Sequence, residues 1–227
     1  MFDSRPNPPA KHAVGDETRQ QLIDAATRVF LAEGFRAARV KDIADAAGVR
    51  LSAINYHFKG KEGLYLAVLE HHARLAMAHS PTPAMSPDLP LQTRFNAFVR
   101  ALVLRMLDPA SPSRISGLMV REAASPTPAL QVMFEHFTKP QSAILFGMLR
   151  EILGPAADDT QVARCGLSIV GQSMVYVGMR PLVELLRPGF YQQAGAVAAL
   201  ADHIAAFSWA GLQALAASNH GTKDHAD

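Results

Sequence analysis

The stretch VKDIADAAGVRLSAINYHFKGKEGLY, residues 40–65, decides the fold of this chain. Apolar residues at helical spacing predict one short helix over residues 40–47 and another over 51–58. Gly48 lies between them, where its freedom to adopt a positive φ permits a tight turn. The small core beneath this turn is expected to contain Ile43, Val49 and Ile54. The stretch therefore predicts a helix-turn-helix unit.

Helical patterns also flank this unit on both sides. A helix is predicted from residue 16 to Gly34, and a fourth helix begins near Lys61. Beyond a proline-rich segment at 80–90, helices are predicted over 91–107, 113–124, 126–153 with a kink at Pro140, 160–186 and 193–217. No stretch alternates with the period of a strand, and no long repeat is visible. The predicted fold class is all-α.

These patterns divide the chain into four parts. Residues 1–14 are expected to form a flexible N-terminal tail, and 218–227 a flexible C-terminal tail. Residues 15–79 form the helix-turn-helix domain, three helices together with a linking fourth helix. Residues 80–217 form a larger, regulatory helical domain.

The composition suits a globular protein with a large buried core. Of the 227 residues, 49% are hydrophobic and 19% are charged, and a single cysteine, Cys165, excludes a disulfide within the chain. The N-terminus has charges and prolines where a signal peptide needs an apolar core, and polar residues interrupt the longest uncharged segment, 204–222. No His, Cys or carboxylate cluster has metal-ligand spacing. We therefore expect a cytoplasmic protein with no membrane span, no metal and no other cofactor.

Positive charge is concentrated in the window that contains the helix-turn-helix. Residues 36–61 hold six basic and two acidic residues, a net charge of +4, whereas residues 1–35 and 62–227 each have a net charge of −1. A local excess of this kind favours binding to a polyanion.

The second helix of such a unit enters the major groove of DNA. Here it presents Ser52 and Asn55 on its outer face, and Asn can pair with adenine through two hydrogen bonds. Side chains that can hold phosphates follow at its far end and at the start of the next helix, namely Tyr56, His57, Lys59 and Lys61. The predicted partner is double-stranded DNA.

At these residues the sequence resembles the TetR family of bacterial transcriptional repressors. The resemblance also covers the preceding stretch LIDAATRVFLAEGF, residues 22–35. It implies that Lys41 contacts phosphate or the groove edge and that Leu51 faces bases beside Ser52 and Asn55. It further implies a C-terminal domain that binds a small-molecule inducer and forms the dimer.

The chain departs from the family pattern at two helix starts. Arg39 and Arg50 stand where the family usually has a Ser or Thr cap. Losing such a cap costs about 1 kcal/mol, while an Arg at the same place can contact a phosphate. We therefore include both arginines among the candidate DNA-binding residues.

The C-terminal part is similar to the CecR-like branch of this family. The similar stretches are MVREAASPTPALQVMFEHFTKPQSAILFGMLREILG, residues 119–154, and SIVGQSMVYVGMRP, residues 168–181. Branches of this kind commonly control transporter or detoxification genes.

Met and aromatic side chains in the C-terminal part can line a pocket for a small, largely apolar inducer. Arg121 and Glu122 would be its polar contacts, and an internal salt bridge between helices is the alternative. For the other candidates the alternative is ordinary core packing, and they are Phe98, Met106, Met119, Met133, Phe137, Gln172 and Tyr176.

The last two predicted helices, 160–186 and 193–217, are apolar around more than one face and rich in Ala and Gly. This exceeds what burial in one domain requires, so it predicts a homodimer with a four-helix interface. The candidate interface residues are Val197, Leu200, Ile204, Phe207, Trp209 and Gly211.

These inferences predict a ligand-responsive homodimeric repressor that binds a palindromic operator, because two-fold symmetry doubles the contacts of one short recognition helix. Two other functions stay open. One is a DNA-binding regulator without an inducer. The other is an enzyme that uses the C-terminal cavity, although the chain offers no catalytic motif and no catalytic residue is assigned.

Overall fold

The computed structural model describes residues 11–83 and 86–221. These residues form helices and connecting turns with no strand among them, which confirms the all-α fold class. The chain divides into two compact units, Met1–His71 and His72–Asp227. The division falls inside one helix, so that α4 (Lys61–His79) contributes residues to both units.

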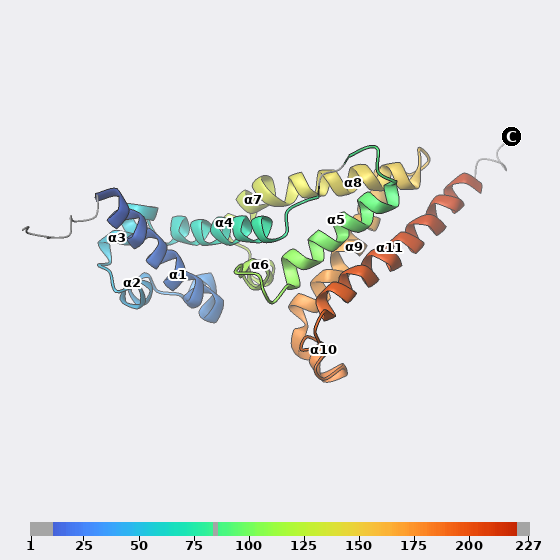
Figure 1. Ribbon diagram of the computed structural model, residues 1–227. Helices are drawn as coiled ribbons and strands as arrows, with labels where there is room; N and C mark the ends of the chain where they lie inside the picture. The colour runs from blue at the N-terminus through green and yellow to red at the C-terminus, as the bar shows by residue number, and fades with distance from the viewer. Residues whose placement is uncertain (1–10, 84–85, 222–227) are drawn as a thin grey trace, which may run out of the picture. The chain divides into compact units, whose positions relative to one another are not determined.

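The N-terminal unit contains the helix-turn-helix (Figure 1). Its elements are α1 (Lys11–Ala37), α2 (Val40–Ala47), α3 (Ser52–Phe58) and the first part of α4. α2 has the predicted bounds and ends at Gly48, whose φ of 68° and ψ of 27° lie in the left-handed region. Gly34 interrupts α1 with a φ of 79° and a ψ of 168°, so the chain turns where the sequence predicted a helix end.

An aromatic cluster holds the N-terminal unit together. The ring of Tyr65 meets Phe30 edge to face at 4.8 Å between centroids and lies 4.9 Å from Phe35. Ile43 and Ile54 are buried as predicted, while Val49 is only half-buried. Burial of these side chains from several elements fixes the position of the two short helices, which are too short to be stable alone.

The C-terminal unit is a bundle of packed helices. Its elements beyond α4 are α5 (Leu91–Leu107), α6 (Ile115–Ala124), α7 (Ala129–Met133), the π-helical turn η1 (Phe134–Thr138), α8 (Lys139–Leu153), α9 (Asp159–Gly178), α10 (Arg180–Leu186) and α11 (Ala196–Gly221). Figure 1 shows α5, α8, α9 and α11 lying along one another. Their shared core includes Phe95, Val99, Leu149, Ile169 and Ile204.

Prolines lie at two changes of helix: Pro140, where the sequence predicted a kink, and Pro181, inside the helix predicted over 160–186. Pro140 has no backbone N–H to donate. The residues just before it form the π-helical turn η1, in which the Lys139 amide donates to the carbonyl of Phe134. The single helix predicted over 160–186 is wrong. It breaks at Met179, because Pro181 cannot continue the hydrogen-bond ladder of α9.

The ends of the chain differ in part from the predicted tails. Residues 11–14 belong to α1 and 218–221 to α11, while 1–10 and 222–227 lie outside the described residues. Asn219 explains the longer α11, because its amide donates to the Leu153 carbonyl at 3.2 Å. Within the described ranges, no helix is long and apolar enough to cross a membrane.

Candidate nucleic-acid interface and C-terminal cavity

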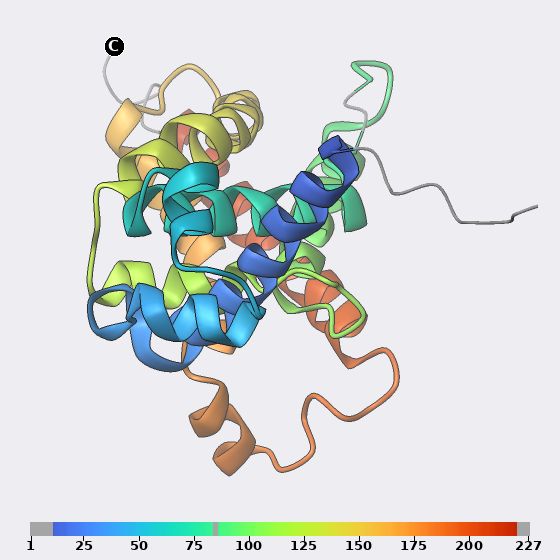
Figure 2. The same cartoon turned by 90° about the vertical axis from the view of Figure 1, so that its left-hand side faces the viewer.

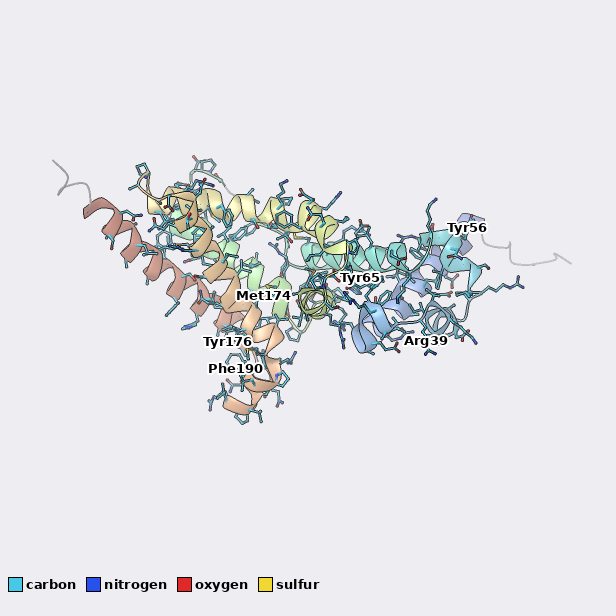
Figure 3. All side chains as sticks on the ribbon, turned by 180° about the vertical axis from the view of Figure 1, so that it is seen from behind. Arg39, Tyr56, Tyr65, Met174, Tyr176 and Phe190 are labelled. Atoms are coloured by element: carbon cyan, nitrogen blue, oxygen red, sulfur yellow. The ribbon has the colours of Figure 1, made fainter. Side chains whose placement is uncertain are left out.

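The recognition helix α3 presents most of the predicted DNA-binding side chains to solvent. Tyr56 is 83% exposed and Leu51 is 48% exposed, and Ser52 and Asn55 share the same exposed surface. Buried Ile54 and Phe58 anchor the opposite face of the helix. Figure 3 shows Tyr56 and Arg39 at the surface of the N-terminal unit. The remaining exposed candidates are Arg39, Lys41, Arg50 and Lys59.

Two predicted phosphate-binding residues are half-buried. Lys61 donates from Nζ to the carbonyl of Arg36 at 3.2 Å, and the same ammonium lies 4.8 Å from the ring centroid of Phe35. His57 packs edge to face against Tyr56 with 4.9 Å between ring centroids. Lys61 thus joins the start of α4 to the end of α1, a structural contact that the sequence did not indicate.

The start of α2 forms part of a hollow beside α3. Arg39 precedes α2 in extended conformation, and no side chain caps this helix start. α3 is preceded by Leu51 rather than by the predicted Arg50, and it too lacks a side-chain cap. The hollow has a volume of about 510 Å³ and includes Arg39, Lys41, Leu51, Asn55 and Lys61. An uncapped helix start beside basic side chains favours an anion.

The C-terminal unit contains a partly open cavity of about 330 Å³. Its wall is formed by α4, α5, α6, α7, η1, α8 and α9, and most of the lining is apolar. Met174 of α9, labelled in Figure 3, is one of the lining residues. A concave, mainly apolar space of this size is at the lower end of ordinary small-molecule sites, about 300–1,000 Å³.

The structure brings five of the nine predicted ligand contacts to this cavity, namely Phe98, Met106, Met119, Met133 and Phe137. The other four lie elsewhere. The amide of Gln172 donates to Ser208 at 3.0 Å, in a separate groove between α9 and α11. The ring of Tyr176 stacks on that of Phe190 with 5.6 Å between ring centroids, and Figure 3 labels the two residues next to each other.

Arg121 and Glu122 are also absent from the cavity wall. Arg121 is exposed, whereas Glu122 is buried with an exposed fraction of 1%. The Glu122 carboxylate accepts hydrogen bonds from the Thr127 amide at 2.6 Å and from the Thr127 hydroxyl at 2.8 Å. Glu122 therefore holds the chain between α6 and α7, which is a structural role.

We expect Glu122→Ala to lower the free energy of unfolding of the C-terminal unit by about 2 kcal/mol, because both Thr127 donors lose a buried charged acceptor. Glu135→Ala is the matched control. It removes an exposed carboxylate from an i, i+4 pair with Lys139, which should cost about 0.5 kcal/mol or less. Denaturant titration measures both values, and equal effects would contradict the assigned role.

Sequence reasoning missed the charged residue of the cavity wall, Arg105. Its side chain has an exposed fraction of 8%. Burial lowers the pKa of its guanidinium. Its spacing on α5 gave no signal, because Arg105 continues the face of Phe98 and Leu102, where an apolar residue is the usual occupant.

The predicted dimer residues separate into two groups. Val197, Leu200 and Ile204 are buried in the core of the C-terminal unit, and Trp209 packs against Phe95 with 5.7 Å between ring centroids. Val197, Leu200 and Ile204 are already buried within the protomer and offer little surface to a second copy, whereas Trp209 is only partly buried. Phe207, 65% exposed, and Gly211 lie on the outer face of α11.

An exposed apolar face runs over α9 and α11. Leu167 and Val175 of α9 are 70% and 48% exposed, and Leu215 of α11 is 41% exposed. Gly171 and Gly211 lie in the same helical rows as these residues, and a Cβ at either position would meet nothing within 4 Å. A groove of about 470 Å³ between the two helices borders this face.

α10 presents a second set of exposed apolar side chains. Leu185 and Leu186 are 79% and 76% exposed. Figure 2 shows α10 and the loop that follows it extending away from the other helices of the C-terminal unit. Across the part of the chain that the structure describes, no group of His, Cys, Asp and Glu side chains is arranged to hold a metal ion.

Comparison with known proteins identifies both units. Residues 22–68 match the family model of the bacterial regulatory proteins of the tetR family, and residues 91–212 match that of the C-terminal domain of the HTH-type transcriptional dual regulator CecR. CecR of Shigella flexneri is 29% identical over 194 residues, which cover 81% of this chain and 86% of that protein. The regulator SrpR of Pseudomonas putida is 36% identical over 99 residues, 44% of each chain.

Solved structures of regulators share the fold. A transcriptional regulator of Pseudomonas aeruginosa PAO1 has a TM-score of 0.59 and 25% identity, covering 92% of this chain and 97% of that chain. A TetR-like regulator of Rhodococcus sp. RHA1 has a TM-score of 0.61 and 18% identity, covering 86% and 95%. The matches to both family models, with the exposed helix-turn-helix, show that the chain is a DNA-binding transcriptional regulator of the TetR family, with a C-terminal domain of the CecR-like branch.

Proposed function

We propose that the protein is a cytoplasmic, ligand-responsive repressor that binds a palindromic operator as a homodimer. The observation that carries this proposal is the exposed surface of α3, where Ser52, Asn55 and Tyr56 lie between basic side chains. A single helix of seven residues offers few base contacts. Two copies related by a two-fold axis reach successive major grooves and double those contacts.

We assign the DNA-binding residues to two groups, those that contact bases and those that contact phosphates. Ser52 and Asn55 read base edges, with Leu51 beside them for apolar contact. The side chains around them hold the sugar-phosphate backbone, and they are Arg39, Lys41, Arg50, Tyr56, His57, Lys59 and Lys61.

Asn55→Ala should lose about 1–3 kcal/mol of discrimination at one base position per half-site, with little change in affinity for random DNA. Lys41→Gln is the matched comparison, because it removes an exposed charge from the same hollow. It should weaken binding to every sequence and lower the salt slope by about one for each half-site. Mobility-shift titrations at several salt concentrations measure both effects. Equal losses by Asn55→Ala on operator and random DNA would make Asn55 a positioning residue instead.

The proposed dimer uses the exposed face of α9 and α11. Leu167, Val175, Phe207 and Leu215 supply apolar contact area, and the open positions of Gly171 and Gly211 permit a close approach of the helices. This arrangement keeps Phe207 and Gly211 from the predicted interface and replaces Val197, Leu200 and Ile204, which are buried in the protomer.

The proposed inducer occupies the C-terminal cavity. α4 lines this cavity with Ala73, Ala76 and Met77, and the same helix carries Leu64 and Tyr65 in the core of the N-terminal unit. A ligand that favours one tilt of α4 therefore changes the spacing of the two recognition helices, through its different affinity for the two states.

Selection of bound genomic fragments by the full-length protein tests this proposal directly. We expect a palindromic site that the dimer binds more tightly than random DNA, and release from that site by a ligand of the cavity. Failure to find any preferred sequence would overturn operator binding. Tight operator binding that no cavity ligand relieves would leave a constitutive regulator as the function.

A further inference from the structure

The wall of the C-terminal cavity contains a buried cation. Arg105 is the one charged residue among the described residues that line this cavity, and its side chain is more than nine-tenths buried. Its Nε donates to the Ser80 carbonyl at 2.8 Å, Nη1 donates to the Gln141 side-chain oxygen at 3.1 Å, and Nη2 donates to the Thr82 hydroxyl at 3.1 Å.

All three acceptors are neutral. Within residues 11–83 and 86–221, no carboxylate lies within ion-pair distance of Arg105. The Ser80 carbonyl follows the end of α4, where the helix dipole is negative, and this compensates part of the charge. A guanidinium has five N–H donors, so these three hydrogen bonds leave two of them for another acceptor.

A buried charge without a counter-ion is costly, because the protein interior replaces only part of its hydration. An apolar residue at this position would continue the face of α5 without that cost. An anion that enters the cavity would supply the counter-charge that Arg105 lacks.

The other lining residues indicate what kind of molecule would bear the anionic group. Thr138, Gln141 and Ser142 lie within about one turn at the junction of η1 and α8, on the side where Gln141 contacts Arg105. Most of the remaining wall is apolar, with methionines on α4, α5, α6, α7 and α9. The cavity is thus polar at Arg105 and apolar beyond it.

We propose that the cavity binds an apolar molecule with a single carboxylate, and that this carboxylate pairs with Arg105. The inference rests on the proposed inducer site and names the chemical class of its ligand. A carboxylate can accept a charge-assisted hydrogen bond from an N–H of Arg105 that the three neutral acceptors leave unused. A polyphosphate needs more than one cation, and the described lining residues supply only Arg105.

The test compares acids with neutral amides of the same shape. Decanoate is paired with decanamide, and naphthaleneacetate with naphthaleneacetamide, and binding to the full-length protein is measured by calorimetry without DNA. We expect the acid of at least one pair to bind about tenfold more tightly than its amide, as a charge-assisted pair should. Amides that bind as tightly as the acids, or no binding by either pair, would overturn the inference.

Two variants test whether the preference for the acid arises at Arg105. Arg105→Gln should reduce the ratio of acid to amide affinity to about one, while Met119→Trp should fill the cavity and weaken both compounds together. An acid preference that survives in Arg105→Gln would also overturn the inference. If that variant does not fold, a crystal structure of the wild-type complex decides, because the carboxylate must lie against Arg105 and not elsewhere.

Failure of this inference is distinguishable from failure of the proposed function. The affinity ratio is measured without operator, so it stands whether or not the ligand releases DNA. Conversely, release of the operator by a neutral compound would support an inducible repressor and contradict the proposal that its ligand is a carboxylate.

Discussion

Gly63→Ala is expected to lower the free energy of unfolding of the N-terminal unit by about 3 kcal/mol or more and to abolish operator binding. A Cβ at position 63 would lie 1.9 Å from the carbonyl oxygen of Phe58. This oxygen belongs to the backbone at the end of α3, so it cannot move aside as a flexible side chain can. The start of α4 must therefore separate from the recognition helix, and the orientation of α3 is lost.

Gly15→Ala is the matched control for this substitution. Gly15 lies in α1 of the same unit, and a Cβ there would meet nothing within 4 Å. Alanine is the better helix former, so this variant should be as stable as wild type or more stable by up to about 1 kcal/mol. Thermal unfolding followed by circular dichroism, with a mobility shift on the operator, measures both variants. A Gly63→Ala protein with wild-type stability would show that α3 and α4 do not approach so closely.

Phe207→Glu is expected to convert the proposed dimer into monomers and to weaken operator binding about 100-fold or more. Phe207 is 65% exposed in the protomer, so glutamate at this position leaves the protomer core intact. In the dimer it would bury a carboxylate in the apolar face of α9 and α11, which carries a large desolvation cost. Light scattering should show a monomer with wild-type helical signal.

Gln213→Glu controls for the added charge. Gln213 is also exposed on α11, but six residues along a helix place it about 120° around the axis from Phe207. This variant should stay dimeric and bind operator as wild type does. Leu200→Glu is not a suitable interface variant, because Leu200 is 5% exposed and the substitution would disrupt the core of the protomer. A dimeric Phe207→Glu protein would place the interface on another surface, and exposed α10 would be the next to test.

The sequence alone determined the N-terminal unit almost completely. The bounds of α2, the turn at Gly48 and the burial of Ile43 and Ile54 all follow from helical spacing over a short range. Local signals suffice for these features because the turn and both short helices lie in one continuous stretch of sequence, although α1 completes the packing beneath them. The exposed face of α3 follows from the same periodicity, and with it the candidate base-contacting residues.

Only the tertiary structure decided which side chains share the C-terminal cavity and which face of α11 is covered. Helical periodicity shows that a face is apolar, but an apolar face is the same whether it packs in the core, lines a cavity or meets a second copy. Leu200 and Phe207 illustrate this, because both are apolar on one helix and only the packing of α5 and α9 buries the first and leaves the second exposed. Arg105 illustrates it again. Its partners at Ser80, Thr82 and Gln141 come from distant parts of the chain, so no local pattern could have marked it as the charge in the cavity wall.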